Sequence, residues 1–412
     1  MAEYEWGGGE IRTEDGFKAF KFKGTGAEYF KLWIVNILLT LVTLGIYYPW
    51  AKVKIKRYCY SNSLLDGRSF NYHASGTQIM ISYLIGVSLI FFYIIIQQMY
   101  VEMTFIVPFI LFCAIPWIIY RSIRFNLTVT SFSNVHFDFI GSLNGAYFNF
   151  FLYPLLFLLS IYLFPVLSAV FMPALAGNPD LVWITYLLPF LMIFSFFAAF
   201  YMYGILKKKN LSYIINNTKY GQGIFKTSLK NKSFMFIGFK TIIVMFFSLF
   251  CGLVVIGGIV YSTIGLDSLI GLEASLQDPL LLQIKLMELL PILIPTYLVM
   301  LLAFLFAISY ASIRQRTYIY ENTTLDDKIN FSSTLRLFPF VWVSFSNFIV
   351  IILSLGLAYP WASVRKIRLI LENTQVDTTI GMNAYLSQKL KEESSLEDTL
   401  GDSFDLNVGI GI

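Results

Sequence analysis

The chain has 412 residues, of which 57% are hydrophobic, 18% aromatic and only 13% charged. Soluble domains carry about a quarter charged residues, so this composition excludes an ordinary soluble protein. A net charge of +5 would suit a nucleic-acid binder, but the Lys and Arg residues cluster at the ends of apolar runs, where membrane topology explains them. We therefore expect a polytopic membrane protein that is surrounded by a lipid bilayer and binds no nucleic acid.

The start of the chain does not resemble a cleaved signal peptide. Residues 1–27 contain no apolar stretch of the kind that forms the core of a signal peptide. We expect this end to stay in the cytoplasm, with residues 1–30 forming an N-terminal segment that ends in a strand. Farther along, "FKFKGTGAEYF" and "FDFIGSLNGAYF" alternate aromatic and polar residues before a membrane entry, which suits either an interfacial belt or a small sheet.

Apolar segments follow one another along the rest of the chain. They cover residues 31–50, 78–99, 103–120, 146–173, 182–206, 234–262, 289–312 and 338–361. Runs of about 20 apolar residues are long enough to cross the hydrocarbon core of a bilayer. The polar stretches between them alternate between a kind that is almost free of basic residues and a kind that is rich in Lys and Arg.

The basic stretches belong to an internal repeat. The clearest copies are "RYCYSNSLLDGRSFNY", anchored on Asn62, and "TYIYENTTLDDKINF", anchored on Asn322. Weaker copies are anchored on Asn217 and Asn373, and "FNLTVTSFSNVHFDF" is a fifth copy that lacks the Asn. Each copy joins two short β-prone stretches through turn-forming residues, which predicts a hairpin. The repeated unit is therefore a membrane helix, a basic cap and a small hairpin.

The first and last apolar segments end in nearly the same motif. "LGIYYPWAKVKIKR" begins at Leu44, and "LGLAYPWASVRKIR" begins at Leu355. If all eight segments crossed the membrane, these matched motifs would face opposite sides. If the two end segments are re-entrant, all 30 Lys and Arg residues except Lys285 fall on the inner side. Basic residues prefer the cytoplasmic side, so the charges favour the re-entrant arrangement with both termini in the cytoplasm.

The predicted fold is an all-α polytopic membrane protein. It has about six transmembrane helices plus two re-entrant or broken helical segments, with small cytoplasmic β-hairpins repeated between helices. After residues 1–30, we divide the chain into a first re-entrant segment with its cap and hairpin (31–77), a six-helix region with internal repeats (78–335), a last re-entrant segment with its cap and hairpin (336–385) and an acidic disordered tail (386–412).

The stretch from Phe20 through "YPWAKVKIKRYCYSNSLLDGRSFNYHASG" resembles the YjgN-like family of bacterial inner-membrane proteins, a domain of unknown function. The resemblance is strong over residues 17–77, fair over 309–385, and extends by general layout over most of the rest. It departs from the family in "AEYFKLWIV" and "KVKIKRYCY", where more Arg and a further aromatic residue are expected. The resemblance implies a multi-pass protein of the bacterial inner membrane. It assigns no catalytic or transport residue.

Enzyme chemistry finds no support in the motifs. The sequence contains no His-Glu-x-x-His, no Gly-x-Ser-x-Gly and no carboxylate pair on an apolar face. The two histidines, His73 and His136, lack Cys or carboxylate neighbours at ligand spacing. We therefore expect no enzyme activity, no catalytic residue, no cofactor and no metal site.

Two functions remain open. Transport or permeation of an unknown solute is favoured by the internal repeat and by polar or hinge residues in the two broken segments. The absence of Asp or Glu at mid-depth in the apolar segments argues against an ion-coupled carrier, and buried Asn can instead join helices by hydrogen bonds. The alternative is a non-catalytic membrane-organising, lipid-interacting or envelope-assembly protein whose basic caps attract anionic lipids at the cytoplasmic face. The candidate residues are Asn36, Thr43, Gly45, Pro49, Trp50, Asn347, Ser354, Gly356, Pro360 and Trp361.

Overall fold

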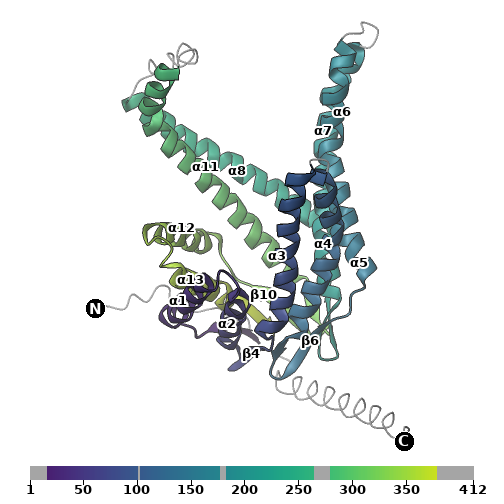
Figure 1. Ribbon diagram of the computed structural model, residues 1–412, viewed down its shortest axis with the longest axis vertical. Coiled ribbons are helices and arrows are strands. Elements are labelled where there is room, and N and C mark those ends of the chain that lie inside the picture. The colour runs from purple at the N-terminus through teal and green to yellow at the C-terminus, as the bar shows by residue number, and fades with distance from the viewer. Residues whose placement is uncertain (1–15, 101–102, 177–181, 264–278, 378–412) are drawn as a thin grey trace, which may run out of the picture.

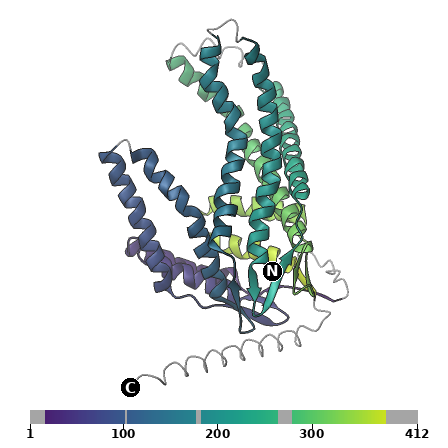
Figure 2. The ribbon, with the colours of Figure 1, turned by 90° about the vertical axis from the view of Figure 1, so that its right-hand side faces the viewer.

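The computed structural model describes residues 16–100, 103–176, 182–263 and 279–377 (Figure 1). The predicted acidic tail (386–412) and the first half of the predicted N-terminal segment lie outside these ranges. The described chain is mostly helical. Its strands gather at one end of the molecule, and the long helices extend away from them (Figures 1 and 2).

The strands form one antiparallel sheet of eleven strands within the described residues, in the order β1-β11-β10-β9-β8-β7-β6-β5-β4-β3-β2. Only Phe20 separates β1 from β2, so the two ends of the sheet are one stretch of chain and the sheet is nearly a closed barrel. The strands are β1 (Phe17–Ala19), β2 (Lys21–Phe22), β3 (Ser63–Leu65), β4 (Arg68–Tyr72), β5 (Thr130–Phe132), β6 (Val135–Phe139), β7 (Thr218–Tyr220), β8 (Gly223–Thr227), β9 (Thr323–Leu325), β10 (Ile329–Ser333) and β11 (Thr374–Asp377).

This sheet corrects the prediction of an all-α protein. The expected hairpins pair internally, as β3 does with β4 and β9 with β10, but each also pairs with the hairpins on both sides of it. An isolated two-stranded hairpin is marginally stable and exposes unpaired edges. Joining the hairpins satisfies those edges and encloses an apolar interior, which no single repeat can do alone.

The helices follow the strands in pairs. They are α1 (Gly26–Val42), α2 (Tyr48–Ser61), α3 (Gly76–Met99), α4 (Met103–Thr128), α5 (Leu143–Tyr147), a π-helical turn η1 (Phe148–Leu152), α6 (Tyr153–Ala176), α7 (Val182–Asn216), α8 (Asn231–Thr263), α11 (Pro279–Glu321), α12 (Leu337–Leu353) and α13 (Tyr359–Glu372). In the part of the chain that the structure describes, six helices are long and apolar enough to cross a membrane. The predicted polytopic membrane protein is therefore confirmed at this level.

Each helix pair leaves the sheet and returns to it. The pair α1/α2 lies between β2 and β3, and the pair α12/α13 lies between β10 and β11. The pairs α3/α4, α6/α7 and α8/α11 are long and diverge away from the sheet, whereas α1/α2 and α12/α13 stay close to it (Figures 1 and 2). The two short pairs are neighbours, because β11 pairs with β1.

The short pairs turn at the Leu-Gly steps that the two matched motifs share. Leu44 and Gly45 have φ angles of 49° and 92°, and Leu355 and Gly356 have φ angles of 52° and 89°. A positive φ ends a helix and reverses the chain, and glycine adopts it without strain. The two Leu side chains are 93% and 95% exposed, so each short pair ends in an apolar tip.

Candidate functional site

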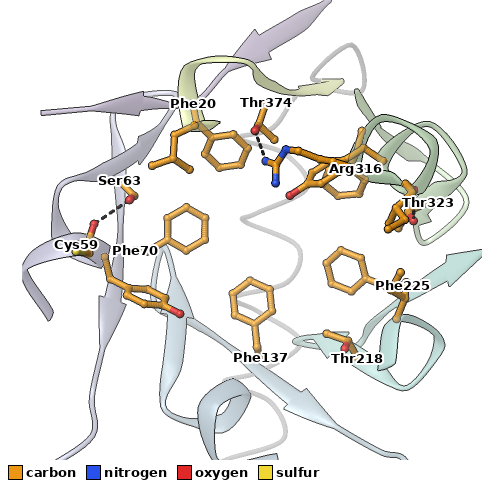
Figure 3. A pocket seen from close by; sticks show the side chains of 16 residues that line it. Phe20, Cys59, Ser63, Phe70, Phe137, Thr218, Phe225, Arg316, Thr323 and Thr374 are labelled. Atoms are coloured by element: carbon orange, nitrogen blue, oxygen red, sulfur yellow. Dashed lines mark hydrogen bonds between the residues drawn. The ribbon is translucent and has the colours of Figure 1, made fainter. Parts of the chain in front are cut away.

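The five repeats place one phenylalanine each around the axis of the barrel. Neighbouring rings lie close together: the centroids of Phe20 and Phe70 are 6.0 Å apart, and those of Phe225 and Phe331 are 5.9 Å apart. The Phe137 ring lies 6.5 Å from that of Phe225. We call these five residues the Phe ring; Figure 3 labels four of them, pointing toward a common centre.

On one side of the Phe ring, the barrel is filled by its own side chains. Leu65, Phe132, Tyr220, Leu325 and Val376 are all buried there, and the Phe ring packs against them. The Tyr220 hydroxyl donates a hydrogen bond of 2.9 Å to the carbonyl of Phe132, so its polar group is satisfied. A small cavity of about 80 Å³ remains among these residues. The barrel core therefore forms an apolar plug on the axis.

On the other side of the Phe ring lies an open cavity of about 550 Å³, lined by residues at the ends of α2, α7, α11 and α13 and by the strands that follow them. We call it the axial cavity, and Figure 3 shows its side chains. Its Ser and Thr hydroxyl groups do not face it as free donors, because each bonds to a carbonyl four residues earlier, in the last turn of the preceding helix. Ser63 donates to Cys59, Thr218 to Ile214, Thr323 to Ile319 and Thr374 to Ile370. The wall is consequently apolar in character.

The asparagine that marks four of the five repeats does not face the cavity as a ligand. The side chains of Asn62, Asn217 and Asn322 donate to the carbonyls of Tyr58, Tyr213 and Tyr318, each four residues earlier, and Asn373 does the same with Leu369. These bonds give a side-chain donor to a carbonyl in the last turn of each helix, where the backbone supplies few donors. The repeated Asn therefore caps the C-terminal end of a helix just before a strand begins.

Arg316 is the one charged side chain among the described residues that line the axial cavity. Its Nη2 donates a 2.6 Å hydrogen bond to Oγ1 of Thr374, and its guanidinium carbon lies 4.5 Å from the ring centroid of Tyr320. Its Nε is buried without a hydrogen-bond partner.

Cys59 also lines the cavity. Burial raises the pKa of its thiol to about 11, so the thiol is protonated at neutral pH. An apolar wall with one cationic side chain is suited to binding a small ligand.

The predicted Asn residues lie in the two short pairs, away from this cavity. Asn347 is buried, and its Nδ2 donates a 2.8 Å hydrogen bond to the carbonyl of Ala362 on the partner helix. Asn36 is also buried, but its Nδ2 has no hydrogen-bond partner. Thr43 and Ser354 stabilise the turns, since their hydroxyls accept from the backbone N–H groups of Tyr47 and Ala358.

The residues of the two matched motifs occupy equivalent places in neighbouring units. Trp50 packs so closely on Gly76 that a Cβ there would lie 2.2 Å from its ring, and Trp361 packs on Gly26 at the same distance. Pro49 and Pro360 are buried in the first turns of α2 and α13, where proline is favoured. None of the ten predicted residues is among those that line the axial cavity, and their predicted role in a permeation route stays a prediction.

Sequence reasoning missed the Phe ring and Arg316. The sequence did carry a signal for the ring, because each repeat has Phe in its second β-prone stretch, followed two residues later by Phe22, Tyr72, Phe139, Thr227 or Ser333. Aligning the repeats on that Phe would have predicted a shared position. Arg316 looked like any other basic residue at the end of an apolar run, and only its contacts distinguish it.

The sequence is similar to a described family and to several named proteins of the inner membrane. Residues 17–403 match the family described as "Bacterial protein of unknown function (DUF898)". The protein named "Inner membrane protein YjgN" from Salmonella typhimurium (strain LT2) is 28% identical over 364 residues, covering 86% of this chain and 87% of the relative. Proteins of the same name from Escherichia coli O157:H7 and Escherichia coli K12 are 27% and 26% identical over 362 residues, with the same coverage. No solved structure matches the chain.

The family match covers most of the chain, and both the names of the relatives and the six apolar helices place such a protein in the inner membrane. The chain therefore belongs to the DUF898 family, and it is a polytopic inner-membrane protein of the YjgN type.

Proposed function

We propose that the protein mediates transport or permeation and that its solute occupies the axial cavity. The observation that carries this proposal is the position of the cavity. It lies on the axis shared by the five repeats, between the membrane helices on one side and the packed barrel on the other. Ligand sites in proteins built from internal repeats commonly lie where the repeats meet.

The distribution of charge supports a cytoplasmic barrel. Basic side chains lie over aromatic rings near the barrel ends of the long helices: Arg121 over Trp117, Lys207 over Tyr203 and Lys209 over Tyr153, at 5.6 to 5.9 Å. Aromatic and basic residues favour the level of the lipid headgroups, and basic residues favour the cytoplasmic side. On this basis both ends of the described chain are cytoplasmic.

The two short pairs provide a route from the bilayer to the cavity. The helices α1 and α2 have 17 and 14 residues, as do α12 and α13, whereas α7 and α11 have 35 and 43. With apolar tips and both ends at the sheet, these pairs enter the membrane and return to the same side. Because they are neighbours, one sector around the barrel carries no long helices, and we propose that lipid-phase molecules approach the cavity there.

The Phe ring then acts as the cytoplasmic closure. A solute in the axial cavity is separated from the cytoplasm by the Phe ring and the packed core behind it. Apolar constrictions block water and ions because wetting them is unfavourable. A path to the cytoplasm would open when these phenylalanines and the core side chains behind them move together.

A polar substitution in the Phe ring tests this proposal. Phe225→Ser should let water enter the constriction and raise the ion leak of proteoliposomes that contain the purified protein. Phe225→Leu keeps the site apolar and is the matched control, which should leave the leak unchanged. An equal leak for both variants, with both proteins folded, would refute the role of the ring as a closure.

The belt of basic and aromatic side chains favours a second candidate function, the organisation of anionic lipids at the cytoplasmic face. Each Lys or Arg near the surface of an anionic membrane contributes about 1 kcal/mol. If this is the function, Arg121→Gln and Lys207→Gln should reduce the anionic lipid that copurifies with the protein while the leak of the Phe225→Ser variant persists.

A further inference from the structure

We infer that the axial cavity binds an anionic amphiphile with a single apolar chain, whose acidic headgroup pairs with Arg316. This inference rests on the proposed function in treating the axial cavity as the solute site, and it names the chemical class of that solute. It follows from the contacts of Arg316, from the walls around it and from a comparison between repeats.

The comparison between repeats isolates Arg316. Each of the five units begins its first strand with a Ser or Thr. The residue seven positions before that Ser or Thr is Lys56, Ile123, Leu211, Arg316 or Ile367. Lys56 does not line the axial cavity; its Nζ donates a 2.5 Å hydrogen bond to Oδ1 of Asn126 and lies 5.0 Å from the ring centroid of Tyr72. Arg316 is thus the cation at this position that lines the axial cavity.

The guanidinium of Arg316 has an N–H group without a hydrogen-bond partner. Of its five N–H groups, Nη2 donates to the hydroxyl of Thr374, a neutral acceptor, and Nε has no partner. The salt bridges within the described residues join Lys18 to Asp66 and Lys226 to Asp327, and neither involves Arg316. A charge in an apolar site is unfavourable unless an opposite charge joins it. An anion in the cavity would provide that charge and could accept two parallel hydrogen bonds.

The walls specify the rest of the ligand. The Phe ring and the side chains of Ile215, Ile319 and Leu371 present apolar surface, and no described lining residue is acidic. A cavity of about 550 Å³ lies within the range of roughly 300–1,000 Å³ that holds a small organic ligand. An inorganic anion would leave most of this apolar surface without contact. One acidic headgroup with one apolar chain satisfies both parts of the site.

Equilibrium binding to the full-length protein in nanodiscs of uncharged lipid tests this inference, with protein-free nanodiscs as background. The probes are radiolabelled dodecanoate, dodecanol, which has the same chain without the charge, and inorganic phosphate as a competitor. Dodecanoate should bind saturably, and dodecanol should bind at least about tenfold more weakly. Because hydrogen bonds to charged groups contribute about 1.5–3 kcal/mol, Arg316→Gln should weaken dodecanoate binding by roughly tenfold to a hundredfold.

The matched control is Arg314→Gln, because Arg314 lies on the same helix but is exposed and placed over Tyr310. This variant should bind dodecanoate like the unaltered protein. Equal binding of dodecanoate and dodecanol to the unaltered protein would overturn the inference without any variant. Unchanged binding by Arg316→Gln, or displacement of dodecanoate by equimolar phosphate, would overturn it as well. The Phe225→Ser leak requires no amphiphile, so failure here can be distinguished from failure of the proposed function.

Discussion

The barrel and the membrane helices of this protein follow different rules, although both are built from the same five repeats. In the barrel, every unit contributes short strands, a hydroxyl residue at the start of the first strand and one member of the Phe ring. Of the helix pairs, three are long enough to cross a membrane and two are short. The barrel is nearly symmetric, and the helices are not.

The difference teaches which part of each unit is constrained by its neighbours. A strand in a nearly closed sheet must match the strands on both sides, and a core side chain must fit a shared interior. A helix that faces lipid has to remain apolar and to suit the thickness of the bilayer, so its length is less closely set by its neighbours. The place where the constrained and the free parts meet is the axial cavity, and there a single unit contributes a charge, Arg316.

Truncation of one large side chain in each region gives the strongest contrast. Phe132 is buried in the barrel core, whereas Phe250 on α8 is 66% exposed on a face that lipid covers. Phe132→Ala should destabilise the protein by about 3–5 kcal/mol, as is usual when a buried Phe is lost. Phe250→Ala should change stability by less than about 0.5 kcal/mol. Denaturant unfolding in detergent measures both, and similar losses would show that the barrel is not the stable part.

The contact that joins the first and last repeats should stabilise the protein as much as a contact between two repeats that follow each other in the chain. Arg57 donates a 3.1 Å hydrogen bond to the carbonyl of Ala74, and Arg368 donates a 3.0 Å hydrogen bond to that of Gly24. Because both arginine side chains are exposed, Arg57→Gln and Arg368→Gln should each cost only about 1 kcal/mol in the same unfolding measurement. The control, Lys52→Gln, alters an exposed basic residue of the same α2 helix as Arg57 and should cost under about 0.5 kcal/mol. A large loss for Arg57→Gln alone would mean that the chain ends do not close the barrel.

The two short pairs can be compared through their buried asparagines. Asn347→Leu removes a buried hydrogen bond, which costs about 0.6 kcal/mol and at most roughly 1.7 between membrane helices. Asn36→Leu should cost less, because the Nδ2 of Asn36 has no partner to lose. Melting temperature beside solute uptake in proteoliposomes tests both. Loss of uptake with unchanged stability would instead place these residues on the permeation route.

The smallest expected effect is a pH dependence at the barrel surface. Partial burial, together with the charges of His136 and Arg57, lowers the pKa of His73, whose Nε2 lies 2.7 Å from Oγ of Ser131. Above a pH of about 6.5 His73 is neutral in both the folded and the unfolded chain. As the pH falls through that value, the unfolded chain takes up a proton first, so stability decreases.

Because His73 is exposed, this loss should be slight, and His73→Gln should reduce it. The comparison of unfolding midpoints at pH 7.5 and pH 5.5 measures it. An identical pH dependence in the variant would show that another group is responsible.

The sequence predicted the local elements better than their assembly. The repeated Asn, the Leu-Gly turns and the apolar runs report on residues that are close in the chain, and the structure has helix ends, turns and long helices at those places. The closure of the sheet depends on pairs such as Phe17 with Asp377, which no local pattern specifies. The hairpins were therefore predictable, but the barrel that unites them was not.

The candidate site shows the same limit. Asn36 and Asn347 drew attention because polar groups are rare in apolar segments, yet such groups can serve packing as well as binding. The Phe ring is apolar among many apolar residues, and its members are spread over residues 20–331. Only the pairing of strands brings them to one axis. Arg316 could be distinguished from the other basic residues only in the structure, where its Nε has no hydrogen-bond partner.

The placement of the short pairs is the claim on which this account most depends, and cysteine accessibility in a background without Cys59, Cys113 and Cys251 tests it directly. An impermeant maleimide should label Tyr100→Cys in intact cells and should not label Asp327→Cys, which it should reach in inside-out vesicles. It should label Leu44→Cys and Leu355→Cys from neither side, because the proposed arrangement places these exposed apolar tips in lipid. Labelling of either tip from outside the cell would contradict the re-entrant arrangement and, with it, the route to the axial cavity.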